Sequence, residues 1–335
     1  MKYIKYGVLA LTLIFVVLSA WMSPKPKTES DFLLDTYVSV TVYEGPSDAA
    51  KVALLETERI HKTFSAYLLE SEVAKINRAE KNTPVFVTEE CISLLQKALE
   101  LSFVTEGNFD LTIKPVMDLW SFSENPKVPE KAELSKVLPA VNYRNLSVDA
   151  ENHTVTKEED GMQIDLGGIA KGYASMRAAE VLLSSGVTSA VLDFGGNVVT
   201  IGERPLRLWD RIKNGTKTKP FIVGIQSPGE TRGAMAETVT IGSSPCAVVT
   251  SGGYERNFTK NGQTYHHIIN PKTGMQPENG ILSVTVVSSD ATTADALSTA
   301  LFVSGPSGVS SVQGMYEEII FIMENGEIKR WKKEK

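Results

Sequence analysis

The chain has 335 residues, a hydrophobic share of 42%, a formal net charge of -6 and an isoelectric point near 5.5. This length and apolar content exclude a disordered protein and provide a sizeable core for one large or two smaller domains. The acidic balance argues against a nucleic-acid partner, because a phosphate backbone requires clustered lysine and arginine. Two basic clusters, at 25–27 and 329–335, are typical of solvated chain ends.

The N-terminus carries Lys2 and Lys5 and then an uncharged apolar run over 6–22. This pattern predicts a signal sequence or a signal-anchor helix. A leucine stands two positions before the best cleavage point, where a small residue is preferred, so retention as an anchor is favoured over cleavage. No cysteine lies nearby to carry a lipid. We therefore expect residues 1–30 to be this segment plus a linker, and 31–335 to lie at the extracytoplasmic face of a bacterial cell membrane, anchored or exported.

Cys91 and Cys246 are the only cysteines of the chain. Two cysteines so far apart are too few for a zinc site and too few for a disulfide framework. We expect both to be small buried hydrophobes. Their distance along the chain leaves a single disulfide between them open.

Apolar periodicity predicts strands interrupted by helices. The first strand is expected at 37–43, and helices are expected at 48–64, 89–103, 169–183 and 291–302. Further strands are expected at 163–166, 189–192, 198–201, 221–225, 237–241, 247–250, 264–269, 282–287, 318–323 and 328–331. Strands that follow one another with helices segregated among them indicate an α+β fold and not a regularly alternating one.

Two segments interrupt this pattern. Residues 121–160 begin with a proline- and lysine-rich stretch that contains a short helical pattern, which predicts a subdomain excursion or a lid. Residues 209–220 look like an insertion in a hairpin. The sequence assigns no function to this insertion.

Residues 165–175 combine a carboxylate, a glycine pair and a lysine at a predicted strand-to-helix turn. Gly167 and Gly168 allow the backbone to approach a ligand closely, and the start of the following helix offers N–H groups to an anion. Lys171 would add a positive charge one turn into the helix. An ordinary turn with a solvated lysine is the alternative, and it is the commoner meaning of an isolated glycine pair.

Asp295 and Thr299 stand four residues apart on the last predicted helix, so their oxygens share one face. A carboxylate and a hydroxyl, completed by main-chain carbonyls and water, are a hard-oxygen set that suits Mg²⁺. The alternative is an aspartate that caps the helix and a threonine that fills it. Asp290 competes for the cap, which leaves Asp295 unexplained inside the helix.

His266 and His267 are adjacent on a predicted strand that leads into a Pro/Gly turn. Neighbouring side chains of a strand face opposite sides, so the two rings are poorly placed to share one metal. One of them is expected to face a cleft and the other to be structural. The residue types alone do not distinguish a base from a histidine bonded to backbone.

Three further segments place aromatics beside glycines or carboxylates: 64–67, 105–120 and 193–197. Together they could position a flat heterocycle, although each is weak alone. With the motifs above, the chain resembles the ApbE-like family, the FAD:protein FMN transferases. The matching pieces are FSAYLLESEVAKIN, TEGNFDLTIKPVMDLWSF, DLGGIAKGYA, DFGGNV, SGGYERNF, HIINPKTG and ADALSTALFV, in the family's order and across about 31–325.

The resemblance implies a T-fold-related architecture of two subdomains, with mixed or antiparallel sheets, flanking helices and the FAD site in the cleft between them. It implies a Mg²⁺ ion held by the side chains of Asp295 and Thr299 and by the carbonyl of Gly168. It implies that Asp295, Lys171 and His267 serve catalysis; His267 matches the family's retained histidine and is the candidate base, with Asp290 as the alternative. The residues expected to contact FAD are Tyr67, Asn108, Phe109, Asp110, Asp165, Lys171 and Ile281, the last through its backbone.

The function implied is Mg²⁺-dependent cleavage of the FAD pyrophosphate, release of AMP and transfer of FMN to a threonine hydroxyl. The implied acceptors are FMN-binding subunits of membrane redox complexes, flavinylated outside the cytoplasm. An FAD pyrophosphatase, which uses water as the acceptor, would need the same ligands. An exported flavin-binding protein without activity is the third hypothesis, and the presence of both Asp295 and Thr299 argues against it.

Overall fold

A computed structural model describes residues 25–122, 125–229 and 234–333. The predicted membrane segment at 6–22 lies outside these ranges, so its anchoring and cleavage stay predictions. None of the helices in the described ranges is both long enough and apolar enough to span a membrane.

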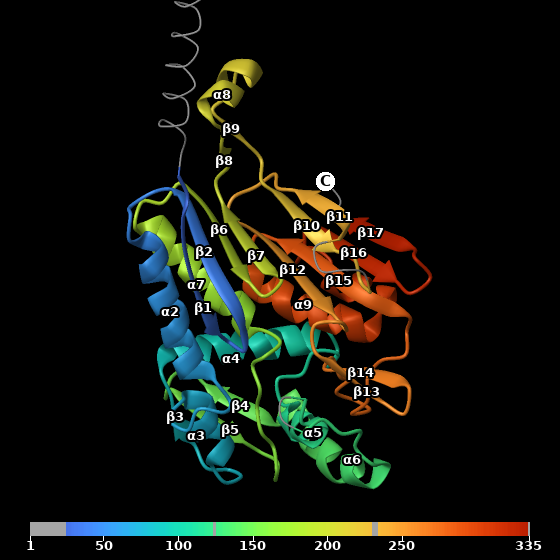
Figure 1. Cartoon of the computed structure of the whole chain (residues 1–335). Coiled ribbons are helices and arrows are strands. Elements are labelled where there is room, and N and C mark those ends of the chain that lie inside the picture. Colours follow the sequence, from blue (N-terminus) through green and yellow to red (C-terminus); the bar gives the residue numbers. More distant parts are fainter. Residues whose placement is uncertain (1–24, 123–124, 230–233, 334–335) are drawn as a thin grey trace, which may run out of the picture.

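The centre of the molecule is an eight-stranded sheet in which each neighbouring pair is antiparallel (Figure 1). In spatial order it contains β1 (Lys27–Leu33), β2 (Thr36–Glu44), β6 (Ser189–Phe194), β7 (Asn197–Ile201), β12 (Cys246–Gly252), β15 (Ile281–Ser288), β16 (Glu318–Met323) and β17 (Ile328–Lys332). The sheet and the helices around it confirm the α+β fold predicted from the sequence.

Burial along the strands follows their place in this sheet. In β2, Val38, Val40 and Val42 are buried and the residues between them are partly exposed, which is the alternation of a strand with one face on the core. The edge strand β1 is exposed along most of its length. The central strand β15 is buried on both faces, so it reads as a nearly continuous run of β-branched residues.

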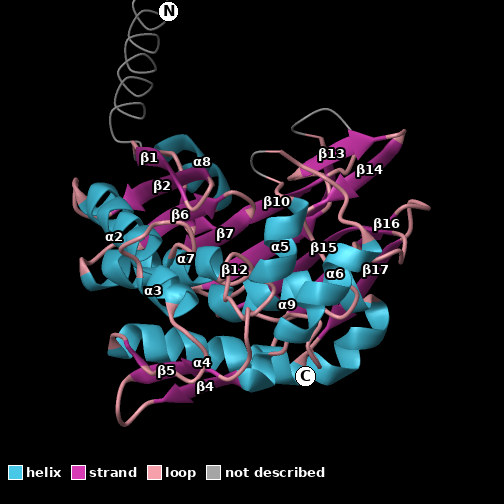
Figure 2. Cartoon of the chain, turned by 90° about the horizontal axis from the view of Figure 1, so that it is seen from below, coloured by secondary structure: helices cyan, strands magenta, loops and turns pink. Residues whose placement is uncertain are grey.

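One face of the sheet is covered by α2 (Ala49–Phe64), α7 (Ala170–Ser184) and α9 (Ala291–Ser304), with α4 (Glu89–Val104) packed nearby (Figure 2). Because α9 is apolar nearly all round, it is a buried core helix. The other face is covered by the hairpin of β10 (Ile222–Gln226) and β11 (Met235–Thr240), whose apolar side chains form a second core cluster with β12 and β16.

A smaller part of the molecule lies at one end of this sheet. It contains α3 (Glu72–Arg78), α5 (Lys114–Trp120), α6 (Lys131–Val137), the 3-10 turns Leu138–Ala140 and Tyr143–Asn145, and a sheet of β3 (Val85–Phe86), β5 (Thr154–Lys157) and β4 (Leu146–Asp149). The excursion predicted at 121–160 falls within it. The hairpin of β13 (Asn257–Lys260) and β14 (Gln263–His266) packs on α5 through Trp120.

The remaining elements are at the other end of the sheet and after α9. The insertion predicted at 209–220 is a helix-tipped hairpin made of β8 (Arg204–Pro205), α8 (Leu208–Asn214) and β9 (Thr218–Lys219), which confirms its assignment to a hairpin. A 3-10 segment, Pro306–Val312, links α9 to β16.

Two sequence predictions about elements are wrong. The segment 163–166 is not a strand: it makes one isolated bridge, and the side chain of Asn77 bonds both the N–H and the carbonyl of Ile164, at 2.7 and 2.9 Å. An amide side chain therefore does there what a neighbouring strand would do. The linker predicted up to residue 30 is also too long, because β1 begins at Lys27 and pairs with β2.

Both cysteines are buried and free. Cys91 belongs to the main core cluster on the helical side of the sheet, whereas Cys246 belongs to the second cluster under the β10–β11 hairpin. Burial raises the pKa of each thiol, so both remain protonated. They behave as the small buried hydrophobes that the sequence predicted.

Candidate functional site

A cavity of about 1830 Å³ lies between the large sheet and the smaller part of the molecule. Its wall includes the β1–β2 turn, the β6–β7 turn, the start of α7, the end of β12 and the segments 64–68 and 108–122. From α9 it includes Thr299 alone. Pockets for drug-sized ligands typically have volumes of roughly 300–1,000 Å³. This cavity therefore has room for an extended dinucleotide, and it lies in the cleft where the sequence placed the site.

The floor of the cavity depends on a close crossing of α7 and α9. A Cβ atom on Gly172 would lie 2.2 Å from the carbonyl oxygen of Ala291 and 2.8 Å from Cβ of Asp295. Only glycine permits this approach. The crossing brings Lys171, in the first turn of α7, close to the carboxylate of Asp295 on α9.

Asp295 is a carboxylate inside an otherwise apolar helix, with 2% of its surface exposed. Its Oδ2 accepts a hydrogen bond from the Gly172 N–H at 2.9 Å, and its Oδ1 lies 3.3 Å from Nζ of Lys171. A buried carboxylate is costly unless it is paired. Since Asp290 makes the helix cap, with 2.9 Å from its Oδ1 to the Thr292 N–H, Asp295 is not needed to start α9.

Thr299 lies one turn further along α9 and lines the cavity. Its Oγ1 is 3.3 Å from Oγ of Ser251 at the end of β12. The Cβ position of Gly168 is 3.7 Å from the same Thr299 oxygen and 3.2 Å from the ring of Phe109. The three residues predicted to hold the metal are thus brought together from α9 and the turn before α7.

This donor set fits Mg²⁺. The described ranges contain no group of three or more His, Cys, Asp or Glu side chains that could hold a metal. Mg²⁺ does not need such a group, because it commonly uses one or two carboxylates and keeps sites for water and phosphate oxygens. Asp295 offers the carboxylate, Thr299 the hydroxyl and Gly168 the main-chain carbonyl, with the Ser251 hydroxyl beside them.

His267 faces the cavity and His266 does not. The His266 ring packs edge-on against Phe302 of α9 at 5.2 Å, so the expectation of one cleft histidine and one structural histidine is confirmed. Nδ1 of His267 lies 3.3 Å from the carbonyl oxygen of Arg256. A proton on Nδ1 satisfies that carbonyl and leaves the Nε2 lone pair available.

The His267 ring is neutral at physiological pH. Burial is the main cause that lowers its pKa to about 3, and the positive charges of Arg256 and Lys171 contribute to the same shift. A neutral ring accepts a proton and does not donate one. Phosphate groups in the cavity would offset those charges and raise this pKa toward its ordinary value.

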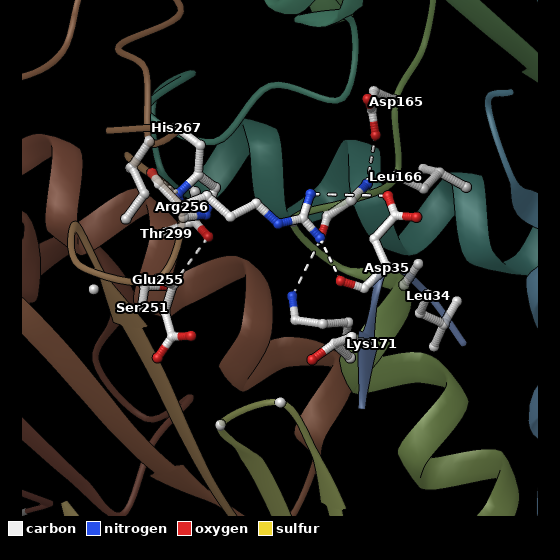
Figure 3. A pocket seen from close by; sticks show the side chains of 18 of the residues that line it. Leu34, Asp35, Asp165, Leu166, Lys171, Ser251, Glu255, Arg256, His267 and Thr299 are labelled. Carbon is white, nitrogen blue, oxygen red and sulfur yellow. Dashed lines mark hydrogen bonds and ion pairs between the residues drawn. The ribbon is translucent and has the colours of Figure 1, made fainter. Parts of the chain in front are cut away.

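Arg256 crosses the mouth of the cavity (Figure 3). One guanidinium nitrogen donates to the main-chain carbonyl of Asp35 at 2.9 Å, and another lies 3.8 Å from its carboxylate. Leu34 and Asp35 both have positive φ angles in the tight β1–β2 turn, an uncommon conformation for such residues. Sequence analysis missed this pair, because its members are 221 positions apart and neither belongs to a charge cluster.

Tyr67 and Asp165 form another part of the cavity wall. The Tyr67 hydroxyl is 3.5 Å from Oδ2 of Asp165, and Nζ of Lys114 stands 4.7 Å from the centre of the Tyr67 ring. Oδ1 of Asp165 accepts from the Gly167 N–H at 2.7 Å and so shapes the glycine turn. Burial raises the pKa of Asp165 and of the Tyr67 hydroxyl.

The segment 108–110 also lines the cavity, but its three side chains differ in what they offer. Asn108 meets Lys272, with 3.2 Å between Oδ1 and Nζ. Phe109 is buried against Gly168. The carboxylate of Asp110 accepts bonds from Thr112 and from the Tyr143 N–H at 3.0 Å, so it holds the loop in shape.

Ile281 is not brought to the cavity. It is the first residue of β15, it pairs with Met323, and it is buried in the core. The isoleucines that do line the cavity are Ile113, Ile268 and Ile269, the last two directly after His267. The contact that the resemblance implied between the Ile281 backbone and FAD stays a prediction, in a region before β15 that carries no motif. Asp290, the alternative base, is likewise absent from the residues that line the cavity, and so is Asp295, which lies buried behind Lys171.

Comparisons with known proteins agree with this geometry. The model of the ApbE family matches residues 34–320. The FAD:protein FMN transferase of Treponema pallidum (strain Nichols) is 32% identical over 289 residues, which are 83% of this chain and 78% of the relative. That of Klebsiella pneumoniae (strain 342) is 30% identical over 302 residues, 89% of this chain and 90% of the relative. The crystal structure of the ApbE protein from Thermotoga maritima superimposes with a TM-score of 0.80 at 34% identity, covering 92% of this chain and 97% of that one.

Proposed function

We propose that this chain, which belongs to the ApbE family, cleaves the pyrophosphate of FAD and transfers FMN to a threonine hydroxyl of an acceptor protein, releasing AMP. Membership of the family makes the chain an enzyme of the transferase class. Dependence on Mg²⁺, the threonine acceptor and AMP as the leaving group are the parts of this proposal that need their own test.

One observation carries the proposal: a hydroxyl, a glycine turn and a lysine line the floor of a dinucleotide-sized cavity, and a buried carboxylate lies directly behind them, paired with the lysine. Lys171 and the carboxylate of Asp295 are 3.3 Å apart, and Thr299 faces Gly168 one turn further on. Oxygen donors beside a cation suit the phosphates of a pyrophosphate and the ion that binds them. A binding site for flavin alone would not need this arrangement.

The reaction is an in-line displacement at the phosphorus of the FMN half. The threonine oxygen forms a bond to that phosphorus, the bond from phosphorus to the bridging oxygen breaks, and AMP leaves with that oxygen. Mg²⁺ held by Asp295, Thr299 and the Gly168 carbonyl would neutralise charge on the phosphate oxygens. Lys171 and Arg256 add fixed positive charge around the same space, and the glycine turn lets the backbone approach the phosphates.

The proton of the incoming hydroxyl needs an acceptor, and His267 is the residue placed for it. Its Nδ1 is held by the Arg256 carbonyl, and it lines the cavity with Thr299 and Lys171. A histidine within reach of the nucleophile is the usual general base. Asp290 makes the cap of α9, which favours His267 over it as the base.

We place the enzyme at the extracytoplasmic face of the cell membrane, where acceptors would be FMN-binding subunits of membrane redox complexes. The support for this location is the apolar run at 6–22, whose structure is outside the described ranges. Mass spectrometry of the mature N-terminus tests it, because a start near residue 21 in a soluble extracytoplasmic fraction would mean a cleaved signal.

The function is tested by incubating the chain with FAD, Mg²⁺ and an acceptor protein that contains a flavinylation threonine. We expect a fluorescent flavin band on the acceptor in a denaturing gel, AMP in the supernatant in equal amount, and neither product in EDTA. An acceptor with that threonine changed to alanine is the matched control. Equal release of FMN and AMP with no labelled acceptor would show a pyrophosphatase and refute the transferase proposal.

A further inference from the structure

The hairpin at residues 204–219, which we call the α8 hairpin, has a charge opposite to that of the rest of the chain. It contains six basic residues and one acidic residue, a net charge of +5 within a chain of net charge -6. The basic residues are Arg204, Arg207, Arg211, Lys213, Lys217 and Lys219. This excess escaped sequence analysis because the six residues are spread through the segment and form no run.

The same hairpin exposes large apolar side chains. No residue of α8 is buried, and Trp209 and Ile212, three residues apart on one helical face, are 60% and 59% exposed. Arg211 turns inward, where its Nε donates to the Leu206 carbonyl at 2.7 Å. An aromatic and an aliphatic residue are therefore largely exposed on one helical face, in a segment whose sequence is rich in lysine and arginine.

Strand register places this hairpin at the end of the sheet opposite to the cavity. Strands β1 and β2 turn at Leu34 beside the cavity, while Lys27 pairs with Val42 near the far end. Glu44 pairs with Ser189 at that far end, and the Ser189 hydroxyl donates to the Glu203 carbonyl at the base of the hairpin. Figures 1 and 2 both show α8 beside the start of β1.

We propose that the α8 hairpin lies on the surface of an anionic phospholipid membrane, with Trp209 and Ile212 in the interface and the basic side chains on the headgroups. Three observations select this occupant. Short amphipathic helices with an aromatic on one side and lysine or arginine around it are suited to the interface of a bilayer. The charge of +5 complements anionic lipids. The chain continues from β1, at this same end, into the apolar run at 6–22.

A geometric consequence follows for the proposed enzyme. Seven residues of β1 separate the hairpin end from the cavity end, which is roughly 20 Å at the usual strand rise. Two contacts, the N-terminal run and the hairpin, would fix the sheet upright on the membrane. The cavity would then open away from the lipid at a set height, which suits an acceptor protein held on the same membrane.

The test uses the full chain mixed with nanodiscs of phosphatidylcholine alone or of phosphatidylcholine with phosphatidylglycerol. Hydrogen exchange of the peptides covering 204–219 is followed by mass spectrometry. In parallel, brominated lipids quench tryptophan fluorescence, and the part lost in Trp209→Phe is assigned to Trp209. We expect slower exchange and Trp209 quenching in the anionic discs, reversed by about 0.5 M NaCl, where the screening length is only a few ångströms.

Variants separate the two parts of the contact. Replacing Arg207, Lys213 and Lys217 with glutamine should weaken the hairpin's hold on anionic discs about a hundredfold, since each basic residue contributes roughly 1 kcal/mol, or about fivefold, at such a surface. Trp209→Ser with Ile212→Ser should abolish the remaining protection. Lys131→Gln with Lys136→Gln on α6, exposed at the other end of the molecule, is the matched control and should change nothing.

Exchange of the hairpin that is the same with anionic discs, neutral discs and no discs would overturn the proposal. Protection that appears without lipid as the protein concentration rises would show that a second copy covers the hairpin, and protection that needs the acceptor would show a protein-docking site. Transfer in detergent, with acceptor in solution, should be unchanged by all these variants. Failure of the lipid contact is thereby distinguishable from failure of the proposed function.

Discussion

Two walls of the cavity are built in opposite ways. The wall at the α7–α9 crossing is buried, and its polar atoms are held by short-range contacts that a single Cβ on Gly172 would break. The wall formed by the β12–β14 segment is half open, and Arg256 reaches across it to Asp35 from an exposed position. The buried wall suits the fixed charges that a reaction at phosphate groups needs. The open wall suits the entry of a large acceptor protein.

The largest expected effect is at the buried wall. Asp295→Ala should lower transfer about 10⁴-fold, the rate equivalent of the several kcal/mol that a metal ion supplies to a phosphoryl transition state. Asp295→Asn, which keeps an acceptor for the Gly172 N–H, should lose activity similarly with an unchanged melting temperature. Asp290→Ala on the same helix is the control: it should cost about 1 kcal/mol of stability as a lost cap and keep full transfer. Full activity of Asp295→Ala in EDTA would refute the metal assignment.

The next effect belongs to the open wall. His267→Ala should depress transfer roughly 10²- to 10⁴-fold with little change in FAD affinity, the scale of general-base catalysis. His266→Ala, which removes the ring packed on Phe302, should instead lower the melting temperature and leave the rate per folded molecule unchanged. FAD binding, melting temperature and transfer are measured on the same preparations. A His267→Ala variant that transfers normally would move the base role elsewhere.

Two glycine substitutions separate the packing of the helices, tested at Gly172, from the approach of the backbone to the ligand, tested at Gly168. Gly172→Ala should destabilise the fold by about 3 kcal/mol, because its Cβ would meet the Ala291 carbonyl at 2.2 Å and backbone must shift. Gly168→Ala meets the edge of the Phe109 ring at 3.2 Å, so the fold should survive while FAD affinity falls. Urea unfolding and FAD titration on both variants decide the matter. Equal free energies of unfolding for Gly172→Ala and Gly168→Ala would show that α7 and α9 can move apart at little cost.

Stability should depend on pH through His267. The unfolded ring has an ordinary pKa of 6.5 and the folded ring one of about 3, so between these values the unfolded state binds the extra proton. Stability from this group is therefore complete above pH 6.5 and is lost as pH falls toward 3. His267→Gln should flatten that part of the curve in urea titrations without FAD. Burial raises the pKa values of Asp110 and Asp165, so these two groups change stability with pH in the opposite direction. Both are present in the original protein and in His267→Gln, so their effect cancels in the comparison.

The smallest effect concerns the bridge across the mouth. Asp35→Asn should change the free energy of unfolding by less than about 1 kcal/mol, because the ion pair with Arg256 is exposed. It also removes a negative charge from the cavity wall, so the KM for FAD should fall by up to about fivefold, the equivalent of about 1 kcal/mol. Arg256→Gln should raise that KM. Identical KM values in all three proteins would exclude this pair from FAD binding.

Much of the candidate site could be predicted from the sequence alone. The four-residue spacing of Asp295 and Thr299, the glycine pair and Lys171 are local patterns whose chemistry is legible without coordinates, and the structure brings them together. The contact assigned to Ile281 rested on a resemblance in a region without a motif, and Ile281 does not line the cavity. The strand expected at 163–166 failed because the partner for its backbone is a side chain, Asn77, from far along the chain.

What the sequence determined by itself is most of the long helices and sheet strands and the identity of the candidate reactive groups, because periodicity and motif spacing act over a few residues. What only the tertiary structure decided is which distant groups meet: Arg256 with Asp35 over the cavity, and Asp295 against the Gly172 N–H. The same holds for the α8 hairpin, whose basic residues became a surface only when strand register set them beside the start of β1. Such meetings depend on sheet order and helix crossing, which arise from packing of the whole chain and not from any one segment.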